Sequence, residues 1–308
     1  MSLVRGDHDP GVLATLRQVR RAYRNWISVL WTAALGGNPR YVELHDGRRI
    51  SFGDPPSLGR GLAVQWLPRL LGAGWTIEKI DESHARLEHA GDRLQFTCRF
   101  LGNWSDIIAL TEVFVDKVYA GDFRGQVVLD VGMADGDSAV FFARNGAVRV
   151  IGVEPLPESY HLALQNLRQN GVEKTVVPLQ GAVASGVGST EIRVATLAPN
   201  RSSAAPERDR TEVEFDSSIS VRAYDFPGLL SAGGVDHLDF VKMDCEGCEY
   251  ALLRSLTDAD FARIDRWILE YHDGPRDLVE ILRSHGFRTS LRGEPIGVLE
   301  AHRPAGPS

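Results

Sequence analysis

Apolar positions divide the chain into two differently patterned parts, and the pattern changes near residue 120. From Leu13 to Leu35 they recur at spacings of three and four residues, which predicts a single amphipathic helix. Its arginines lie mostly on the opposite face: Arg17, Arg20, Arg21 and Arg24. The simpler interpretation is the solvated side of a packed helix, and the alternative is a helix that meets an anionic membrane surface or a partner.

The segments that follow alternate apolar and polar residues, as half-buried strands do. Residues 41–52 alternate around Asp46-Gly47, and residues 85–100 alternate around Ala90-Gly91-Asp92, so each segment predicts a hairpin. We therefore interpret residues 1–120 as an accessory region of mixed α and β structure that covers the substrate.

From Gly125 onwards, strands and helices alternate. Strands are predicted at residues 127–130, 148–153, 175–180, 191–196, 238–243, 266–272, 287–291 and 296–301. Helices are predicted at residues 137–145, 156–170, 246–256 and 275–285. This order predicts an α/β fold with a mostly parallel, doubly wound sheet over residues 121–302. A Pro-, Ser- and Arg-rich flexible loop interrupts it at residues 197–210, and a disordered tail follows at residues 303–308.

Composition narrows the class of protein. Of 308 residues, 43% are hydrophobic and 24% are charged, which excludes bulk disorder. The net charge is −7, whereas a dedicated nucleic-acid binder usually carries a basic excess, so no nucleic-acid partner is expected. No apolar stretch has the length of a signal peptide or a membrane span, so we expect a cytoplasmic protein.

The cysteines are Cys98, Cys245 and Cys248, too few for a disulfide scaffold, and they favour a reducing compartment. The spacing of the last two is Cys-x-x-Cys. A zinc or redox role would need further ligands or a thioredoxin-like context, and neither is visible. We interpret both as small filler residues beside Glu246 and Glu249.

A glycine-rich loop is predicted where the strand at 127–130 ends and the next helix begins. It reads Asp130-Val-Gly132-Met-Ala-Asp135-Gly136-Asp137. Glycines there let the backbone approach a ligand closely, beside the free N–H groups of a helix N-terminus. Glu154 ends the following strand, where an acid can accept both hydroxyls of a ribose. Together these features predict a nucleoside cofactor.

The loop chemistry distinguishes between cofactors. A dinucleotide fold needs G-x-G-x-x-G, so that the helix N-terminus meets a pyrophosphate, and this spacing is absent. The acids Asp130, Asp135 and Asp137 would repel a pyrophosphate. They match a ligand with a cationic amine and a sulfonium, namely S-adenosyl-L-methionine, whose product is S-adenosyl-L-homocysteine.

Four segments follow one another along the chain: the Asp130–Asp137 loop, Val153-Glu154-Pro155, the KMDCEGCEY segment at 242–250, and Leu269-Glu-Tyr-His272. As a set, over roughly residues 125–275, they resemble the FkbM family of S-adenosylmethionine-dependent methyltransferases. The resemblance implies a class I, Rossmann-like methyltransferase fold of seven strands with the last one antiparallel. It also implies methyl transfer to a hydroxyl of a sugar or another natural-product intermediate.

The same resemblance implies roles for individual residues. Those expected at the cofactor are Asp130, Gly132, Asp135 and Gly136 on the methionine side, Glu154 at the ribose, and Gly181-Ala182-Val183 by the adenine. Asp244 and Glu246 would open the acceptor side of the pocket. The loop departs from the family's DVGANIGD, because Met133, Ala134 and Asp135 replace Ala, Asn and Ile.

Methyl transfer to an alcohol benefits from a general base. Glu270 and His272 are two residues apart on a strand, so they share a face at the edge that also carries Asp244. We expect His272 to be the base, with Asp244 or Glu246 orienting it or the acceptor; a structural histidine is the alternative. Mg²⁺ bound by the acids of this region is a further reading, but hydrogen bonding by these acids is favoured and no metal is assigned.

Other functions stay open from the sequence alone. The acceptor could instead be an amine or a carboxylate, and a non-catalytic scaffold is a weaker alternative that the intact cofactor residues oppose. The expected partner is a small molecule or a glycan. Arg201, Arg208 and Arg210 are candidates for an anionic acceptor, although a solvated loop is the simpler interpretation. The helix with Trp26 and Trp31 is a candidate homodimer surface.

Overall fold

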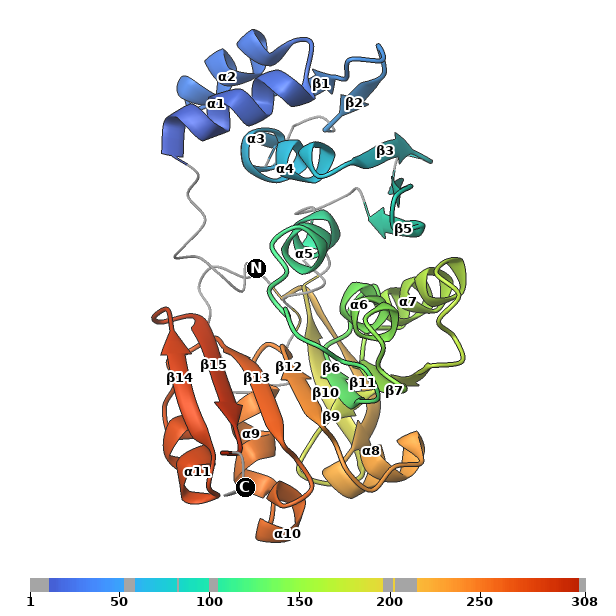
Figure 1. Cartoon of the computed structure of the whole chain (residues 1–308), viewed down its shortest axis with the longest axis vertical. Helices are drawn as coiled ribbons and strands as arrows, with labels where there is room; N and C mark the ends of the chain where they lie inside the picture. Colours follow the sequence, from blue (N-terminus) through green and yellow to red (C-terminus); the bar gives the residue numbers. More distant parts are fainter. Residues whose placement is uncertain are drawn as a thin grey trace. The chain divides into compact units, whose positions relative to one another are not determined.

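The computed structural model describes residues 11–52, 59–81, 83–99, 105–195, 202 and 215–304. Most of the predicted loop at 197–210, including its three arginines, lies outside these residues, as does most of the predicted tail. The chain divides into two compact units between Tyr119 and Ala120. The first unit contains the elements up to α5 (Ser105–Phe114), and the second contains those from β6 (Val127–Val131) onwards (Figure 1).

In the first unit, the predicted helix over residues 13–35 is wrong as a single element. It is two helices, α1 (Gly11–Ala22) and α2 (Trp26–Ala34). Tyr23 is fully buried and pairs as a β-bridge with Leu44. The Arg24 N–H donates to the Glu43 carbonyl at 2.8 Å, and Asn25 accepts the Glu43 N–H at 2.8 Å. Pairing with a neighbouring strand thus overrides a helical periodicity that continues through the break.

The rest of this unit contains both predicted hairpins and a further strand. The antiparallel pair β1 (Tyr41–Glu43) and β2 (Arg49–Ser51) is the first hairpin. The second, β4 (His84–His89) and β5 (Leu94–Arg99), is joined by β3 (Trp75–Lys79) in a three-stranded sheet. The helical segments are α3 (Gly59–Gly61), η1 (Leu62–Trp66), α4 (Leu67–Gly72) and α5 (Ser105–Phe114). The candidate dimer surface on α2 is exposed at Ile27 and Trp31, and a homodimer stays a prediction.

The second unit is built on the predicted alternation of strands and helices. Its sheet strands are β6 (Val127–Val131), β7 (Arg149–Glu154), β8 (Val176–Gln180), β12 (Phe240–Met243), β13 (Arg266–Tyr271), β14 (Arg288–Arg292) and β15 (Gly297–His302). Its helices are α6 (Asp137–Arg144), α7 (Pro157–Gln169), α8 (Phe226–Gly233), α9 (Cys248–Ser255), α10 (Asp258–Phe261) and α11 (Leu278–Ser284). A small second sheet contains β9 (Ala182–Val183), β10 (Gly188–Val194) and β11 (Ser217–Tyr224).

The seven strands lie in the order β14-β15-β13-β12-β6-β7-β8 (Figure 1). Neighbouring strands from β13 to β8 are parallel, whereas β15 runs antiparallel to both β13 and β14. The predicted doubly wound sheet with an antiparallel last strand is therefore confirmed. The strand order reverses between β6 and β12, and in open α/β sheets ligands bind at such a switch point, beyond the carboxyl ends of the strands.

The two faces of this sheet have different chemistry. One face is apolar and packs against α8, α9 and α11 through residues such as Leu129, Val241 and Leu269. On the other face, Lys242 of β12 is in register with Asp130 of β6. Because side chains alternate along a strand, Glu270 of β13 lies on this second face as well. Buried charged groups are thus concentrated on one side of the sheet.

None of the helices in the described ranges is long and apolar enough to cross a lipid bilayer.

Candidate active site

The predicted site residues gather at the carboxyl ends of four neighbouring strands. Asp130 and the glycine loop end β6, Glu154 is the last residue of β7, Asp244 follows β12, and His272 follows β13. These strands are adjacent and parallel. One edge of the sheet therefore carries both the residues predicted for the cofactor and those predicted for the acceptor.

Backbone hydrogen bonds hold the glycine loop to the end of β7. The N–H groups of Gly132 and Met133 both donate to the Val153 carbonyl, at 2.9 and 3.1 Å. Gly132 has φ +78°, and a Cβ built on it would lie 1.9 Å from the Asp244 carbonyl oxygen. Only a residue without a side chain fits this contact. The loop after β6 and the loop after β12 thus touch backbone to backbone.

The second half of the loop leads into α6. Gly136 has φ +87° and caps the helix, and a Cβ there would come within 3.2 Å of Ala163 on α7. Asp135 has no exposed surface, and its backbone carbonyl accepts a 2.8 Å hydrogen bond from the Asn166 amide. Ala134, which stands in place of the family's Asn, adopts φ +47°. The altered loop keeps the sharp turn through packing against α7.

The interior of this loop contains a charged pair that the sequence analysis did not assign. The Lys242 ammonium lies 3.0 Å from Asp130 Oδ1 and donates to the Gly132 carbonyl at 2.6 Å. The other oxygen of Asp130 accepts the Ser138 hydroxyl at 2.6 Å, and all of Asp130 is buried. Burial alone would lower the pKa of Lys242, but Asp130 and Asp244 raise it, so the ammonium stays protonated. The sequence signal that could have revealed this pair is the single lysine within the otherwise apolar strand FVKM.

Glu154 connects the loop to the neighbouring strand end. One of its carboxylate oxygens accepts the Ala134 N–H at 3.1 Å and the other accepts the Leu156 N–H at 2.9 Å. These two N–H groups hold the carboxylate at the carboxyl end of β7, where the ribose is predicted to bind. The Glu154 carbonyl accepts the Gly181 N–H at 3.0 Å, which brings the predicted adenine segment alongside. Ala182 itself is buried in a cluster with Leu156 and Ile192.

On the other side of the loop contact, carboxylates surround one imidazole. His272 Nε2 lies 3.7 Å from Asp244 Oδ1 and 3.5 Å from both Glu246 Oε2 and Glu270 Oε1. His272 Nδ1 lies 3.5 Å from Glu249 Oε1. We call these five residues the His272 cluster. Its members are buried except Asp244, whose side chain is 29% exposed.

The charge of the His272 cluster changes the chemistry of the imidazole. Burial by itself lowers the pKa of His272, but Glu246, Glu249 and Asp244 outweigh it, so the pKa is raised above its usual value of 6.5. A histidine with a raised pKa is a stronger base once it is neutral, because it holds an accepted proton more tightly.

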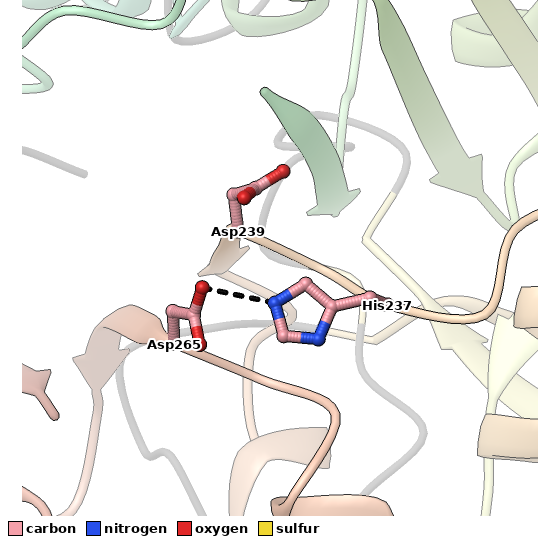
Figure 2. A group of neighbouring side chains, drawn as sticks. All are labelled: His237, Asp239 and Asp265. Carbon is pink, nitrogen blue, oxygen red and sulfur yellow. Dashed lines mark hydrogen bonds and ion pairs between the residues drawn. The ribbon is translucent and has the colours of Figure 1, made fainter. Parts of the chain in front are cut away.

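Two groups in the described part of the chain have a donor arrangement that could hold a metal ion. One, Asp244, Glu270 and His272, belongs to the His272 cluster. The other group, drawn in Figure 2, is His237, Asp239 and Asp265. It lies where β12 and β13 begin, whereas the His272 cluster lies where these strands end. There His237 Nε2 is 2.9 Å from Asp265, and Asp239 accepts the Val127 N–H at 2.7 Å. Both bonds are made within the protein: they hold the beginnings of the strands together and already occupy His237, Asp239 and Asp265.

The interpretation of Cys245 and Cys248 as separate filler residues is wrong, because a disulfide joins them. Their Cα atoms are 5.5 Å apart, within the range that a disulfide spans. The cause is local: the chain turns sharply between them, with positive φ at Glu246 and Gly247, before α9 begins at Cys248. Spacing alone did not reveal this turn.

The strand order, with its antiparallel last strand, and the glycine loop after β6 are those of a class I methyltransferase fold. Residues 130–289, more than half of the chain, match the model of the methyltransferase FkbM domain. The chain belongs to this family. The predicted family membership is therefore confirmed.

Two curated relatives and a solved structure are similar to the chain. The hexuronic acid methyltransferase AglP of Haloferax volcanii is 25% identical over 167 residues, covering 54% of this chain and 64% of that protein. The AMB antimetabolite synthetase AmbE of Pseudomonas aeruginosa is 26% identical over 230 residues, covering 60% of this chain and 11% of that protein. The crystal structure of methyltransferase FkbM from Methylobacillus flagellatus KT is 17% identical, with a TM-score of 0.43, covering 63% of this chain and 47% of that one.

Proposed function

We propose that this protein transfers the methyl group of S-adenosyl-L-methionine to a hydroxyl group of a saccharide or a related secondary metabolite. The observation that carries the proposal is the backbone contact between Gly132 and Asp244. It joins the loop that suits the cofactor to the residue that leads into the His272 cluster. Donor and acceptor would then meet at one edge of the sheet, as in-line displacement requires.

The residues present fit this cofactor. Glu154 places a carboxylate, a group that accepts hydrogen bonds from ribose hydroxyls, at the end of β7. Gly132 keeps the loop free of a side chain that would collide with the neighbouring backbone. Lys242 and Asp130 support the loop from the interior. When bound, the cofactor supplies an electrophilic methyl group.

The His272 cluster supports a hydroxyl as the acceptor. Asp244 is its most exposed member, so we assign to Asp244 the hydrogen bond from the acceptor hydroxyl. His272 lies 3.7 Å behind it and takes up the proton that the hydroxyl loses. The surrounding carboxylates repel an anionic reacting group, which opposes direct methylation of a carboxylate. Once it has taken up this proton, the imidazole carries a positive charge among the carboxylates, and the proposal assigns no metal to the His272 cluster.

The pH dependence of turnover tests this role of His272. Only the neutral imidazole accepts a proton, and its pKa is raised, so kcat/KM should rise with increasing pH through a midpoint above 6.5. The measurement is the pH profile of methyl transfer, made in the presence of a chelator. A profile that is flat from pH 6 to 9, or activity that chelation abolishes, would contradict the assignment.

His272→Gln should lower kcat by roughly 100-fold, with the Kd for S-adenosylhomocysteine nearly unchanged and the acid limb of the pH profile gone. His237→Gln is the matched control, because His237 also pairs with an aspartate (Figure 2). It precedes β12, whereas the His272 cluster lies where β12 and β13 end. Turnover of His272→Gln equal to that of His237→Gln would show that His272 is structural only.

The acceptor can be tested with sugar acids, because one relative is a hexuronic acid methyltransferase. With a methyl glucuronoside as substrate, we expect an ether product that survives mild alkali, because the acidic cluster favours a hydroxyl over a carboxylate. The measurement is mass spectrometry before and after alkali, with the neutral methyl glucoside as a comparison. Release of methanol by alkali would instead identify a carboxyl methyltransferase.

A further inference from the structure

The turn between β12 and α9 is closed by the Cys245–Cys248 disulfide. The two residues inside the closed ring, Glu246 and Gly247, have φ of +57° and +118°. A left-handed conformation is unfavourable by roughly 1–2 kcal/mol for a residue with a side chain. The bond therefore ties together the ends of a turn that Glu246 would otherwise tend to leave.

This closed turn carries most of the negative charge around His272. Glu246 lies inside the ring, Asp244 immediately precedes it, and Glu249 immediately follows it. Their carboxylate oxygens lie 3.5, 3.7 and 3.5 Å from the imidazole nitrogens. A change in the turn consequently moves three of the four carboxylates of the His272 cluster together.

Reduction would also add a hydrogen-bond donor at this point. Cys245 Sγ lies 3.4 Å from Glu249 Oε2, which already accepts the Gly247 N–H at 2.8 Å. In the disulfide this sulfur has no proton to donate, whereas a Cys245 thiol donates its S–H to the carboxylate. The carboxylate that faces His272 Nδ1 is thus contacted differently in the two oxidation states.

We propose that Cys245 and Cys248 form a thiol–disulfide exchange site whose oxidation state sets the geometry of the His272 cluster. Its reaction partner is a small-molecule disulfide of the glutathione class. One cysteine thiolate attacks this disulfide and releases the first small thiolate; the second cysteine thiolate then attacks the mixed disulfide and releases the second. The two cysteine protons pass to the released thiolates, so the products are the protein disulfide and two small thiols.

The consequence for catalysis rests on the proposed methyl transfer. The disulfide form holds the carboxylates around His272 and is the more active form. In the dithiol form Glu246 can leave its left-handed conformation, and Glu249 gains a competing donor. Because displacement of a catalytic group by about 1 Å can cost a factor of 100, we expect kcat to fall roughly tenfold or more on reduction.

The first experiment measures the exchange itself and needs no activity. The full-length protein is equilibrated in glutathione buffers of increasing reduced-to-oxidised ratio, alkylated after denaturation, and analysed by peptide mass spectrometry. The expected result is a single two-electron transition of Cys245 with Cys248, with Cys98 alkylated throughout. Cys98→Ala, which removes the buried free cysteine of the first unit, should give the same transition. A pair that stays dithiol, or stays disulfide, at every ratio would overturn the proposal.

The second experiment links the exchange to the His272 cluster. The imidazole proton signals of His272, assigned with His272→Gln, should differ between the two redox forms, and identical signals would overturn the coupling. Cys245→Ser should turn over like the reduced enzyme and no longer respond to glutathione. Equal turnover of oxidised and reduced enzyme would overturn the regulatory consequence. Failure to bind S-adenosylhomocysteine in either form would refute the proposed function instead, because the exchange and the imidazole signals are measured without it.

Discussion

Lys242→Met should lower the free energy of unfolding by roughly 3–5 kcal/mol, because it leaves the fully buried Asp130 carboxylate without its cation. Methionine fills a similar volume, so the loss is electrostatic rather than a packing defect. The measurement is thermal or denaturant unfolding. For a unit of this size the expected fall in Tm is of the order of 10 °C.

The same substitution should also weaken binding of S-adenosylhomocysteine. The Lys242 ammonium donates to the Gly132 carbonyl at 2.6 Å and so holds the glycine loop in place. Two variants separate the effects. Lys174→Met, on an exposed lysine of the same unit, controls for the loss of charge. Lys242→Met with Asp130→Leu removes both charges, so it should recover much of the stability without restoring the loop. A Tm of Lys242→Met equal to that of Lys174→Met would refute the buried pair.

Gly132→Ala should weaken cofactor binding by more than about 100-fold, because a misplaced binding loop costs affinity steeply. A Cβ at this position would lie 1.9 Å from the Asp244 carbonyl oxygen and 2.9 Å from its carbon. Neither atom is the end of a flexible side chain, so the two loops must separate. The measurement is calorimetric titration with S-adenosylhomocysteine.

Gly171→Ala is the matched control for this prediction. Gly171 has φ +66°, close to the +78° of Gly132, yet a Cβ there meets nothing within 4 Å. Both variants therefore introduce the same backbone strain of roughly 1–2 kcal/mol, and only one introduces a collision. Equal affinities in the two variants would mean that the contact between the loops does not matter for binding.

Most of the second unit could be predicted because its signals are local. The predicted strands at 148–153 and 296–301 differ by one residue at each end from β7 and β15. Short apolar runs bounded by glycine and by helix-stop residues carry this information within a few positions. The single helix predicted over residues 13–35 failed for the opposite reason. Its break at Tyr23 comes from pairing with Leu44, a contact absent from the local pattern.

The candidate site also contains residues that the sequence pointed to and contacts that only the tertiary structure revealed. Residue type and order pointed to Gly132, Glu154, Asp244 and His272, and the structure brings them to one edge of the sheet. Their ligand contacts and catalytic roles stay predictions. Lys242 was visible as a charge in an apolar strand, but its role required the register that places it opposite Asp130. Likewise, the Cys-x-x-Cys spacing was plain, while its disulfide depended on the turn through Glu246 and Gly247.

By itself, the sequence determined the alternating strands and helices, the glycine loop and the acid that follows it, because these depend on neighbours a few residues apart. Only the tertiary structure decided which distant groups meet: the ammonium beneath the loop, the backbone contact at Gly132, and the carboxylates around His272. The physical reason is that pKa shifts and steric limits depend on distances through space. Strand pairing and the loops at the strand ends set those distances, and Lys242 and Asp130 meet although they are more than a hundred positions apart in the sequence.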